Sequence, residues 1–298
     1  MKMNTLKSFF AGAMLCLLPL HVLAQNVSSE TSQQDAASLF LLGNDYFLGK
    51  NGKTRDYAEA AKWYRKAAEQ GYEHAQAALG QMYFAGWGVA QDYAEGLKWS
   101  QKSAEQGSAH GMWIMGEAYQ YGRGVTQDYA EAAKWYRKAA EQGHARAQGE
   151  LGRMYFAGWG VAQDYAEGLK WSQKSAEQKD AIGMWLMGWA YQDGNGVTQD
   201  YAEAFKWYRK AAEQGFAAGE VSLASLYYLG MGVEQDYAEA FKWCQKAADK
   251  GLAEAEFFLG LMYQHGEGVT KDLNMARQWY QKAADQGHKK AKQMLGIQ

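Results

Sequence analysis

Apolar residues along this chain follow the spacing of amphipathic helices. Between residues 74 and 85 they fall at i, i+3, i+4, i+7 and i+8, as one buried helix face requires: Ala75, Ala78, Leu79, Met82 and Tyr83. A second helical segment runs from Asp92 to Gln106, after a loop that contains two glycines. Glycine readily takes the left-handed conformation that ends a helix, so this loop separates two predicted helices, helix A and helix B.

The same pair of helices returns along the chain at a fixed interval of 36 residues. The segment from Asp56 to Gly71 is repeated unchanged from Asp128 to Gly143. Looser copies begin at Asp92, Asp164, Asp200, Asp236 and Asp272. A period of this length is typical of solenoids, in which each unit packs only on its neighbours. We therefore predict an all-α fold, a right-handed α-solenoid superhelix of about seven helix–turn–helix repeats with a C-terminal capping helix.

Three repeated positions predict how the helices begin, pack and end. Each helix B begins with Asp, and in six copies Glu follows three residues later, which is the pattern of a capping box. A glycine that should cost about 1 kcal/mol lies within helix A, and a Trp or Tyr of helix B is expected to cover the gap. These glycines are Gly80, Gly116, Gly152, Gly188, Gly260 and Gly296. Lys179 replaces the glycine that ends helix B elsewhere, at a cost of up to about 1 kcal/mol if the backbone there is left-handed.

The first residues have the composition of a cleavable secretory signal peptide. Residues 1–24 combine two lysines, a short apolar run from Phe9 to Leu20 and a small residue, Ala24, before a polar stretch, and we expect cleavage after Ala24. That run is too short to span a bilayer, and Cys16 lies inside it rather than at a lipidation site. We expect a flexible leader at residues 25–36, a solenoid at residues 37–298, a periplasmic or secreted location, and no membrane span after cleavage.

Charge and reactive residues narrow the classes of function. Without residues 1–24 the chain has 29 Lys and Arg against 33 Asp and Glu, and no basic stripe, so we predict no nucleic-acid partner. Motifs for nucleophilic catalysis, zinc or phosphate binding are absent, so no catalytic, cofactor-binding or metal-binding residues are predicted. His74 and His110 share one position in successive units, but the next two units have Arg146 and Ile182 there, which are not zinc ligands. We therefore predict no zinc site at this position. Cys244 is expected to be a packing residue rather than a reactive thiol.

Three motifs in each unit together resemble the Sel-1-like repeat, a relative of the tetratricopeptide repeat. They are Ala-x-x-x-Leu-Gly-x-Met-Tyr, then Gly-x-Gly-Val, then Asp-Tyr-x-x-Ala-x-x-Trp-Tyr-x-Lys-Ala-Ala-x-x-Gly, and the resemblance covers residues 37–298. It implies that helix A lines the concave side of the superhelix and that the chain is a non-catalytic scaffold binding a partner protein. It also leaves open a periplasmic immunity protein that sequesters a toxic effector, a host-interacting virulence factor, and an architectural spacer.

An enzyme is the remaining alternative. Some cysteine-rich relatives have been assigned β-lactamase or penicillin-binding activity, but they carry paired cysteines in each repeat. After signal cleavage this chain retains only Cys244, and it has no Ser-x-x-Lys motif. We therefore predict that it is not an enzyme.

Comparison of two internal copies points to helix A as the partner-binding surface. Residues 56–127 and 128–199 differ at 13 positions, all in helix A or its flanking turns. Several differences lie at spacings that form one stripe along helix A, where aromatic residues would act as binding anchors, unless they pack internally. The predicted partner-binding residues are Trp113, Glu117, Tyr121, Arg153, Trp185, Trp189, Tyr228, Phe257 and Phe258.

Overall fold

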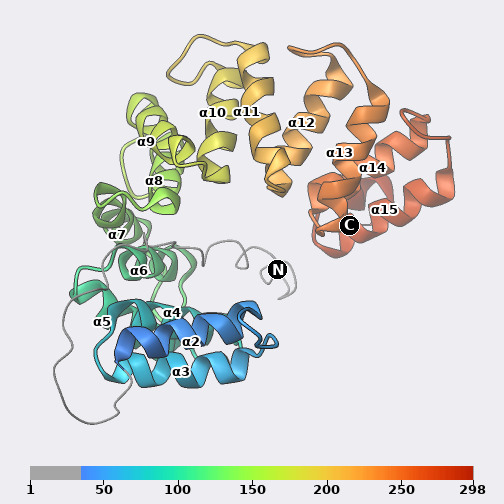
Figure 1. The fold of residues 1–298 in the computed structure, drawn as a ribbon. Coiled ribbons are helices and arrows are strands. Elements are labelled where there is room, and N and C mark those ends of the chain that lie inside the picture. Colours follow the sequence, from blue (N-terminus) through green and yellow to red (C-terminus); the bar gives the residue numbers. More distant parts are fainter. Residues whose placement is uncertain (1–34, 298) are drawn as a thin grey trace. The chain divides into compact units, whose positions relative to one another are not determined.

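The computed structural model describes residues 35–297, and its regular elements in that range are all helices (Figure 1). The chain divides into two compact units with a boundary between His144 and Ala145. The predicted signal peptide and most of the predicted leader lie outside the described residues. The prediction of an all-α repeat solenoid is confirmed.

Each unit consists of consecutive helix pairs. The N-terminal unit holds α2 (Ala36–Leu48), α3 (Tyr57–Glu69), α4 (Glu73–Ala85), α5 (Tyr93–Glu105), α6 (Ala109–Tyr121) and α7 (Tyr129–Glu141). The C-terminal unit holds α8 (Ala145–Ala157), α9 (Tyr165–Glu177), α10 (Ala181–Asp193), α11 (Tyr201–Glu213), α12 (Ala217–Leu229), α13 (Tyr237–Asp249), α14 (Ala253–His265), α15 (Leu273–Asp285) and α16 (Lys289–Met294). Helix A of each repeat is even-numbered, from α2 to α14, and helix B is odd-numbered, from α3 to α15.

Every helix A packs on the helix B of its own repeat, as α4 does on α5 and α10 does on α11. Helix B in turn packs on the next helix A, as α5 does on α6. The A helices also touch one another directly, α4 with α6 in the N-terminal unit and α8 with α10 in the C-terminal unit. Within each unit, neighbouring A helices therefore form a layer in which residues from successive repeats lie side by side.

Aspartate caps helix B as predicted, but the predicted capping box is incomplete. Asp92 Oδ1 accepts hydrogen bonds from the backbone N–H groups of Ala94 and Glu95, at 2.9 and 3.1 Å. In a full box the Glu95 side chain would bond back to the Asp92 N–H. That N–H instead donates to the Tyr83 carbonyl of helix A, and the Glu95 carboxylate pairs with Lys98 at 2.7 Å. The hydrogen bond between the two helices replaces the local one.

The expected aromatic cover of the mid-helix glycines is confirmed in alternate repeats. A Cβ at Gly116 would lie 2.5 Å from the ring of Tyr136, and at Gly188 it would lie 2.5 Å from Tyr208. In the intervening repeats Ser100 faces Gly80, so that the two helix backbones approach each other directly. The same serine arrangement recurs at Gly152 with Ser172.

Two further predictions concerned Gly296, expected within a helix, and Lys179, expected to have a left-handed backbone at the end of a helix B. The prediction for Gly296 was wrong, because α16 ends at Met294 and Gly296 has a φ of 71° beyond it. A short final helix has too few residues to reach that position. Lys179 does take the left-handed conformation, with a φ of 63°, and the predicted strain at that position is present.

The second glycine of each loop joins neighbouring repeats. In the sequence both loop glycines were interpreted as helix-ending residues, and Gly86 does end α4 with a φ of 68°. Gly88 lies instead against the backbone of Tyr57, at the start of the preceding helix B. Gly124 lies in the same way against Tyr93, where a Cβ would come within 2.8 Å of the carbonyl oxygen. This glycine therefore permits the close approach of one repeat to the next.

Candidate protein-binding surface

The nine predicted partner-binding residues all lie on A helices. Trp113, Glu117 and Tyr121 are on α6, in the N-terminal unit. The C-terminal unit carries the rest: Arg153 on α8, Trp185 and Trp189 on α10, Tyr228 on α12, and Phe257 and Phe258 on α14. Their side chains differ widely in exposure, so the sequence stripe does not form one uniform surface.

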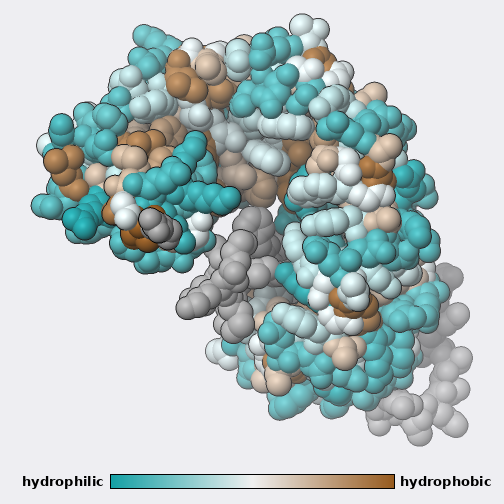
Figure 2. Space-filling model, turned by 180° about the vertical axis from the view of Figure 1, so that it is seen from behind, coloured by the Kyte–Doolittle hydropathy of each residue, from teal (hydrophilic) through white to brown (hydrophobic). Residues whose placement is uncertain are grey.

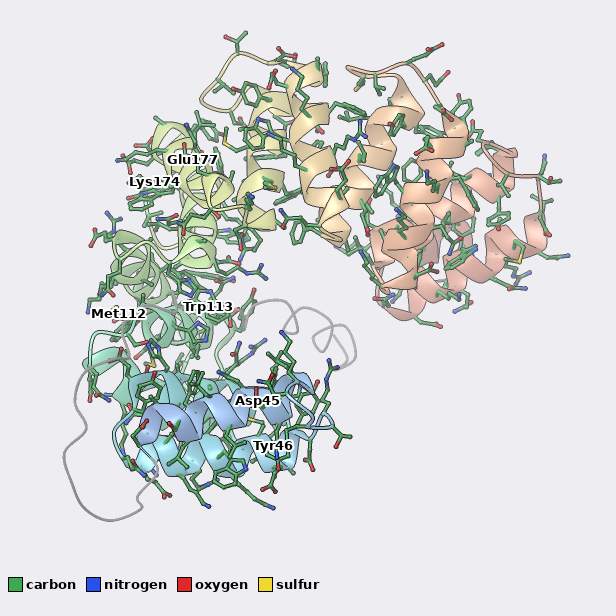
Figure 3. All side chains as sticks on the ribbon, viewed as in Figure 1. Asp45, Tyr46, Met112, Trp113, Lys174 and Glu177 are labelled. Atoms are coloured by element: carbon green, nitrogen blue, oxygen red, sulfur yellow. The ribbon has the colours of Figure 1, made fainter. Side chains whose placement is uncertain are left out.

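Two of the nine residues belong to the core. Trp113, labelled in Figure 3, is 1% exposed. Its ring lies against those of His110 and His144, with centroids 5.2 and 5.5 Å away. Phe257 is 9% exposed and stacks on His288 at 4.6 Å. The alternative that this helix position packs internally therefore holds for both, and neither side chain offers an anchor to a partner.

The half-buried aromatic residues join successive repeats of the C-terminal unit. Trp185 Nε1 donates to Ser222 Oγ of the next A helix at 3.1 Å. Trp189 packs edge-to-face on Phe156 of the preceding A helix, at 5.1 Å between centroids. Sequence reasoning missed this bridging role because a single repeat pattern does not show which neighbour a side chain reaches.

Tyr228 is another bridging residue. Its hydroxyl donates to Glu267 Oε2 at 2.6 Å, and its ring packs edge-to-face on Phe258 at 5.0 Å. Burial, together with the hydrogen bond to Glu267 and its charge, raises the pKa of Tyr228 to about 12. The phenol therefore stays protonated and keeps donating at neutral pH.

The accessible part of the A-helix layer lies one or two helical turns beyond the position of Trp113, toward the C-terminal end of each A helix. Tyr121 is 49% exposed, with Arg123 4.8 Å from the centre of its ring. Glu117 and Arg153 are half-buried. Leu229, at the same helix position as Tyr121, is 51% exposed and was not among the predicted residues. Leu229 could have been predicted as a contact residue from the sequence, because it is an apolar residue at a variable position of helix A.

A loop residue outside the predicted set is also accessible. Trp159 lies between the two loop glycines after α8 and is 40% exposed, with the Arg153 guanidinium 5.1 Å from its ring. Its position between two glycines was visible in the sequence, but its exposure was not. Figure 2 shows hydrophobic residues in small separate groups on a mostly hydrophilic face.

Part of the sequence variation in helix A serves packing rather than a surface. Ala78, Ile114, Glu150 and Leu186 occupy one varied position and are all buried. A Cβ at Gly149 would lie 3.0 Å from Ile182 in the next A helix, and the corresponding residues of the earlier copy are Ala77 and His110. A larger residue in one helix is thus matched by a smaller one in the next, as close packing between helices requires.

Cys244 is a packing residue, as predicted. Its side chain is fully buried, and its Sγ lies 3.2 Å from the carbonyl oxygen of Ala255. Burial raises the pKa of the thiol far above its ordinary value, so the reactive thiolate is not populated near neutral pH.

A histidine pair in the N-terminal unit makes the stability of the protein sensitive to pH. His110 Nδ1 lies 3.3 Å from His144 Nε2, and both rings flank Trp113. Burial, with a smaller contribution from the nearby His74, lowers the pKa of His110 from 6.5 to about 4. Because the folded state binds fewer protons than the unfolded state in this window, stability is present above pH 6.5 and is lost as the pH falls toward 4.

We expect the free energy of unfolding to fall by about 2 kcal/mol between pH 7.5 and pH 5 through His110 alone. Urea unfolding at the two pH values measures the loss, and His110→Phe is the control because it keeps an aromatic ring beside Trp113. The variant should lose about 2 kcal/mol less than the parent on acidification. Equal losses in the two proteins would show that His110 titrates normally in the fold.

The arrangement as a whole defines a class of protein. Paired helices repeat at a fixed interval, and the A helices form layers with varied side chains, which is the construction of a tetratricopeptide-like α-solenoid. The Sel1 repeat family model matches seven consecutive segments that together cover residues 36–288. The chain belongs to the Sel1 repeat family. That fold is generally a non-catalytic scaffold for protein–protein interaction.

Solved structures with the same fold include two relatives of more than 30% identity. A Sel1 repeat protein from Oxalobacter formigenes is 35% identical, with a TM-score of 0.65 over 88% of this chain and 75% of that one. A protective antigen of uropathogenic Escherichia coli strains is 39% identical, with a TM-score of 0.63 over 87% of this chain. The chain covers only 55% of that antigen's length.

A third structure, immunity protein Pa5087 from Pseudomonas aeruginosa, is similar in fold alone. It is 22% identical, with a TM-score of 0.51 over 74% of this chain and 84% of its own. No curated protein matches the chain.

Two further structural findings concern membranes and metals. Between residues 35 and 297, none of the helices has the length and apolar character needed to cross a bilayer. Over the same range, His, Cys, Asp and Glu side chains do not gather in groups of three or more that could hold a metal ion.

Proposed function

We propose that this protein binds a partner protein through the accessible side of its A helices. The observation that carries the proposal is the chemistry at one exposed helix position across neighbouring repeats. That position holds Tyr121 in the N-terminal unit. In the C-terminal unit it holds Ala157, Asp193, Leu229 and His265, where α10 packs beside both α8 and α12. All five residues are exposed. A layer that presents different side chains at regular spacing can recognise a specific sequence, while helix B repeats its packing residues.

Of the predicted residues, those that retain accessible surface are the proposed contacts. Tyr121 and Trp189 are the strongest candidates in their respective units, since partly exposed aromatic residues supply large contact areas. Glu117 and Arg153 would add charged contacts. Trp185, Tyr228 and Phe258 would contribute the edges that remain outside the contacts between repeats.

The test is capture of the tagged protein with its partner from its own cells, followed by measurement of the dissociation constant for the identified pair. Tyr121→Ala and Trp189→Ala should each weaken binding roughly 30-fold, the loss expected at a binding hot spot of about 2 kcal/mol. Leu273→Ala is the control, because Leu273 is exposed on helix B.

Two outcomes would contradict the proposal. One is the absence of any reproducible partner. The other is a loss of binding in the Leu273→Ala control as large as in the helix A variants. Thermal unfolding of each variant separates a lost contact from a lost fold, which matters for Trp189 because it packs on Phe156.

We further propose that the protein works in the cell envelope or outside the cell. The support is the signal-peptide pattern of residues 1–24, which lie outside the described part of the structure. N-terminal sequencing of protein from the periplasmic fraction should give Gln25 as the first residue. Recovery in the cytoplasm with Met1 retained would exclude export.

A further inference from the structure

The sequence holds two Asn-Gly dipeptides, and both lie in loops that follow an A helix. They are Asn51-Gly52 after α2 and Asn195-Gly196 after α10. In such a dipeptide the glycine nitrogen can attack the side-chain amide of the asparagine, because glycine has no Cβ to obstruct the approach. The attack also needs a peptide that is free to rotate, so the surroundings of each loop decide whether the reaction takes place in the folded protein.

The loop after α2 leaves its Asn-Gly pair open to solvent. Asn51 and Gly52 are both exposed and have φ angles of 51° and 76°. The Lys53 N–H donates to the Lys50 carbonyl at 2.9 Å, and two positive φ angles inside such a hydrogen bond define a type I′ turn. A Cβ at Gly52 would meet nothing within 4 Å, so the peptide has room to rotate once this exposed hydrogen bond opens.

The loop after α10 holds the same dipeptide in place. Gly196 has a φ of 78° and packs on the preceding helix B, where a Cβ would lie 2.8 Å from the Tyr165 carbonyl oxygen. The Asn195 N–H donates to the Ala190 carbonyl at 2.9 Å. Rotation of the Asn195-Gly196 peptide would therefore break a contact between two repeats as well as a hydrogen bond at the end of α10.

Neighbouring charges also favour the reaction in the first loop. The glycine nitrogen must lose its proton before it attacks, so negative charge develops on the backbone. Positive charges close to a developing negative charge lower the barrier, and negative charges raise it. Lys50 and Lys53 flank the first dipeptide, whereas Asp193 lies two residues before Asn195. Packing and charge thus distinguish the two loops in the same direction.

We propose that Asn51 is a site of spontaneous deamidation in the folded protein and that Asn195 is protected from it. The Gly52 nitrogen loses its proton to hydroxide and forms a bond to Asn51 Cγ. The bond from Cγ to Nδ2 then breaks, and Nδ2 takes up a proton from water and leaves as ammonia. Water opens the resulting succinimide ring at either carbonyl, which gives aspartate or isoaspartate and restores the Gly52 N–H.

The reaction changes the contact between the loop and α2. Asn51 Nδ2 donates to Asp45 Oδ1 at 2.8 Å, which retains the amide and slows its departure. In the aspartate product an oxygen takes the place of Nδ2, and the new carboxylate has no proton to donate near neutral pH. Two like charges then face each other at the end of α2, where the unmodified protein has a hydrogen bond.

The experiment incubates the purified protein at mildly alkaline pH in water labelled with heavy oxygen. Mass spectrometry of proteolytic peptides then follows both dipeptides, and the label excludes deamidation that occurs later, during digestion. In the folded protein Asn51 should deamidate at least about tenfold faster than Asn195, which corresponds to about 1.4 kcal/mol in activation free energy. In urea the contact of Gly196 is lost and only the neighbouring charges differ, so the ratio should fall to about threefold or less.

Two variants test the assignment within the folded protein. Asp45→Ala removes the acceptor that retains the Asn51 amide, and it should speed deamidation of Asn51 about two- to fivefold. The rate at Asn195 in the same molecules is the matched control and should not change. Asn51→Gln should abolish the labelled product in this loop, because the longer side chain would have to close a larger ring.

Three outcomes would overturn the proposal. The first is an equal or faster reaction at Asn195 in the folded protein. The second is an Asn51 that stays intact for as long as the unfolded chain takes to react at both sites, since the turn would then protect it too. The third is a rate ratio that does not fall in urea, which would show that the local sequence, and not the packing of Gly196, distinguishes the two sites.

Discussion

Replacing Gly88 by alanine should cost the N-terminal unit about 2–5 kcal/mol of stability. The substitution meets two penalties. Gly88 has a φ of 65°, a left-handed conformation that costs an alanine about 1–2 kcal/mol. A Cβ there would also lie under 3.0 Å from the Tyr57 backbone, and the resulting displacement adds about 1–3 kcal/mol. Because the contact is with backbone rather than a side-chain end, no rotamer change relieves it.

The matched control is Gly107→Ala. Gly107 has a φ of 93°, but a Cβ at this position would meet nothing within 4 Å. Two repeats later the same position is occupied by Lys179, which shows that this position tolerates a side chain. This variant should lose only the backbone term of about 1–2 kcal/mol. Chemical unfolding measures both, and equal losses would show that Gly88 is required only for its conformation.

Cys244→Tyr should destabilise the C-terminal unit by about 2–6 kcal/mol. In other repeats a tyrosine at this position lies over a mid-helix glycine, as Tyr208 does over Gly188. Here the facing residue is Ala224, and Cys244 is fully buried beside it. The tyrosine ring would overlap the Ala224 methyl group, which costs about 1–3 kcal/mol. Its buried hydroxyl adds about 1–3 kcal/mol, because the glutamine that accepts from Tyr208 is replaced here by Tyr228.

The double variant Ala224→Gly with Cys244→Tyr tests the cause. Glycine removes the overlap, so the double variant should be about 2 kcal/mol more stable than the sum of the two single effects predicts. Ala224→Gly alone should lose about 1 kcal/mol through helix propensity. Unfolding curves of the four proteins complete the cycle. Strictly additive effects would mean that the glycine–tyrosine pairing is not a packing requirement.

The residue of helix B that faces the mid-helix glycine alternates between tyrosine and serine, so the packing pattern repeats every two repeats rather than every one. Tyrosine faces glycine at Gly116 and Gly188, whereas serine faces it at Gly80 and Gly152. A serine lets the two helix backbones approach, while a tyrosine separates them and donates to a glutamine, as Tyr136 does to Gln120 at 2.7 Å. Neighbouring repeats therefore differ in how closely their two helices pack, although the helices have the same length and each helix B is capped by an aspartate.

The sequence was sufficient for the fold because its signals are local and repeated. Helix periodicity, the aspartate caps and the loop glycines each act within a few residues. Because they recur every 36 residues, they predict a solenoid of helix pairs. The exposed half of the candidate surface was predictable on the same grounds, since Tyr121 follows from the helix stripe. Lys179 could also be placed correctly, because its position in the repeat fixed the backbone conformation required of it.

What the sequence determined by itself was the helix pairs, their order, their family and the set of positions free to vary. Only the tertiary structure decided which varied positions face solvent. Trp113 and Phe257 lie in the core, Trp185 and Tyr228 bond to the next repeat, and Gln81 is left buried without a partner. The physical reason is that burial here depends on contacts between successive A helices, and a pattern within one repeat does not specify how the next repeat is placed.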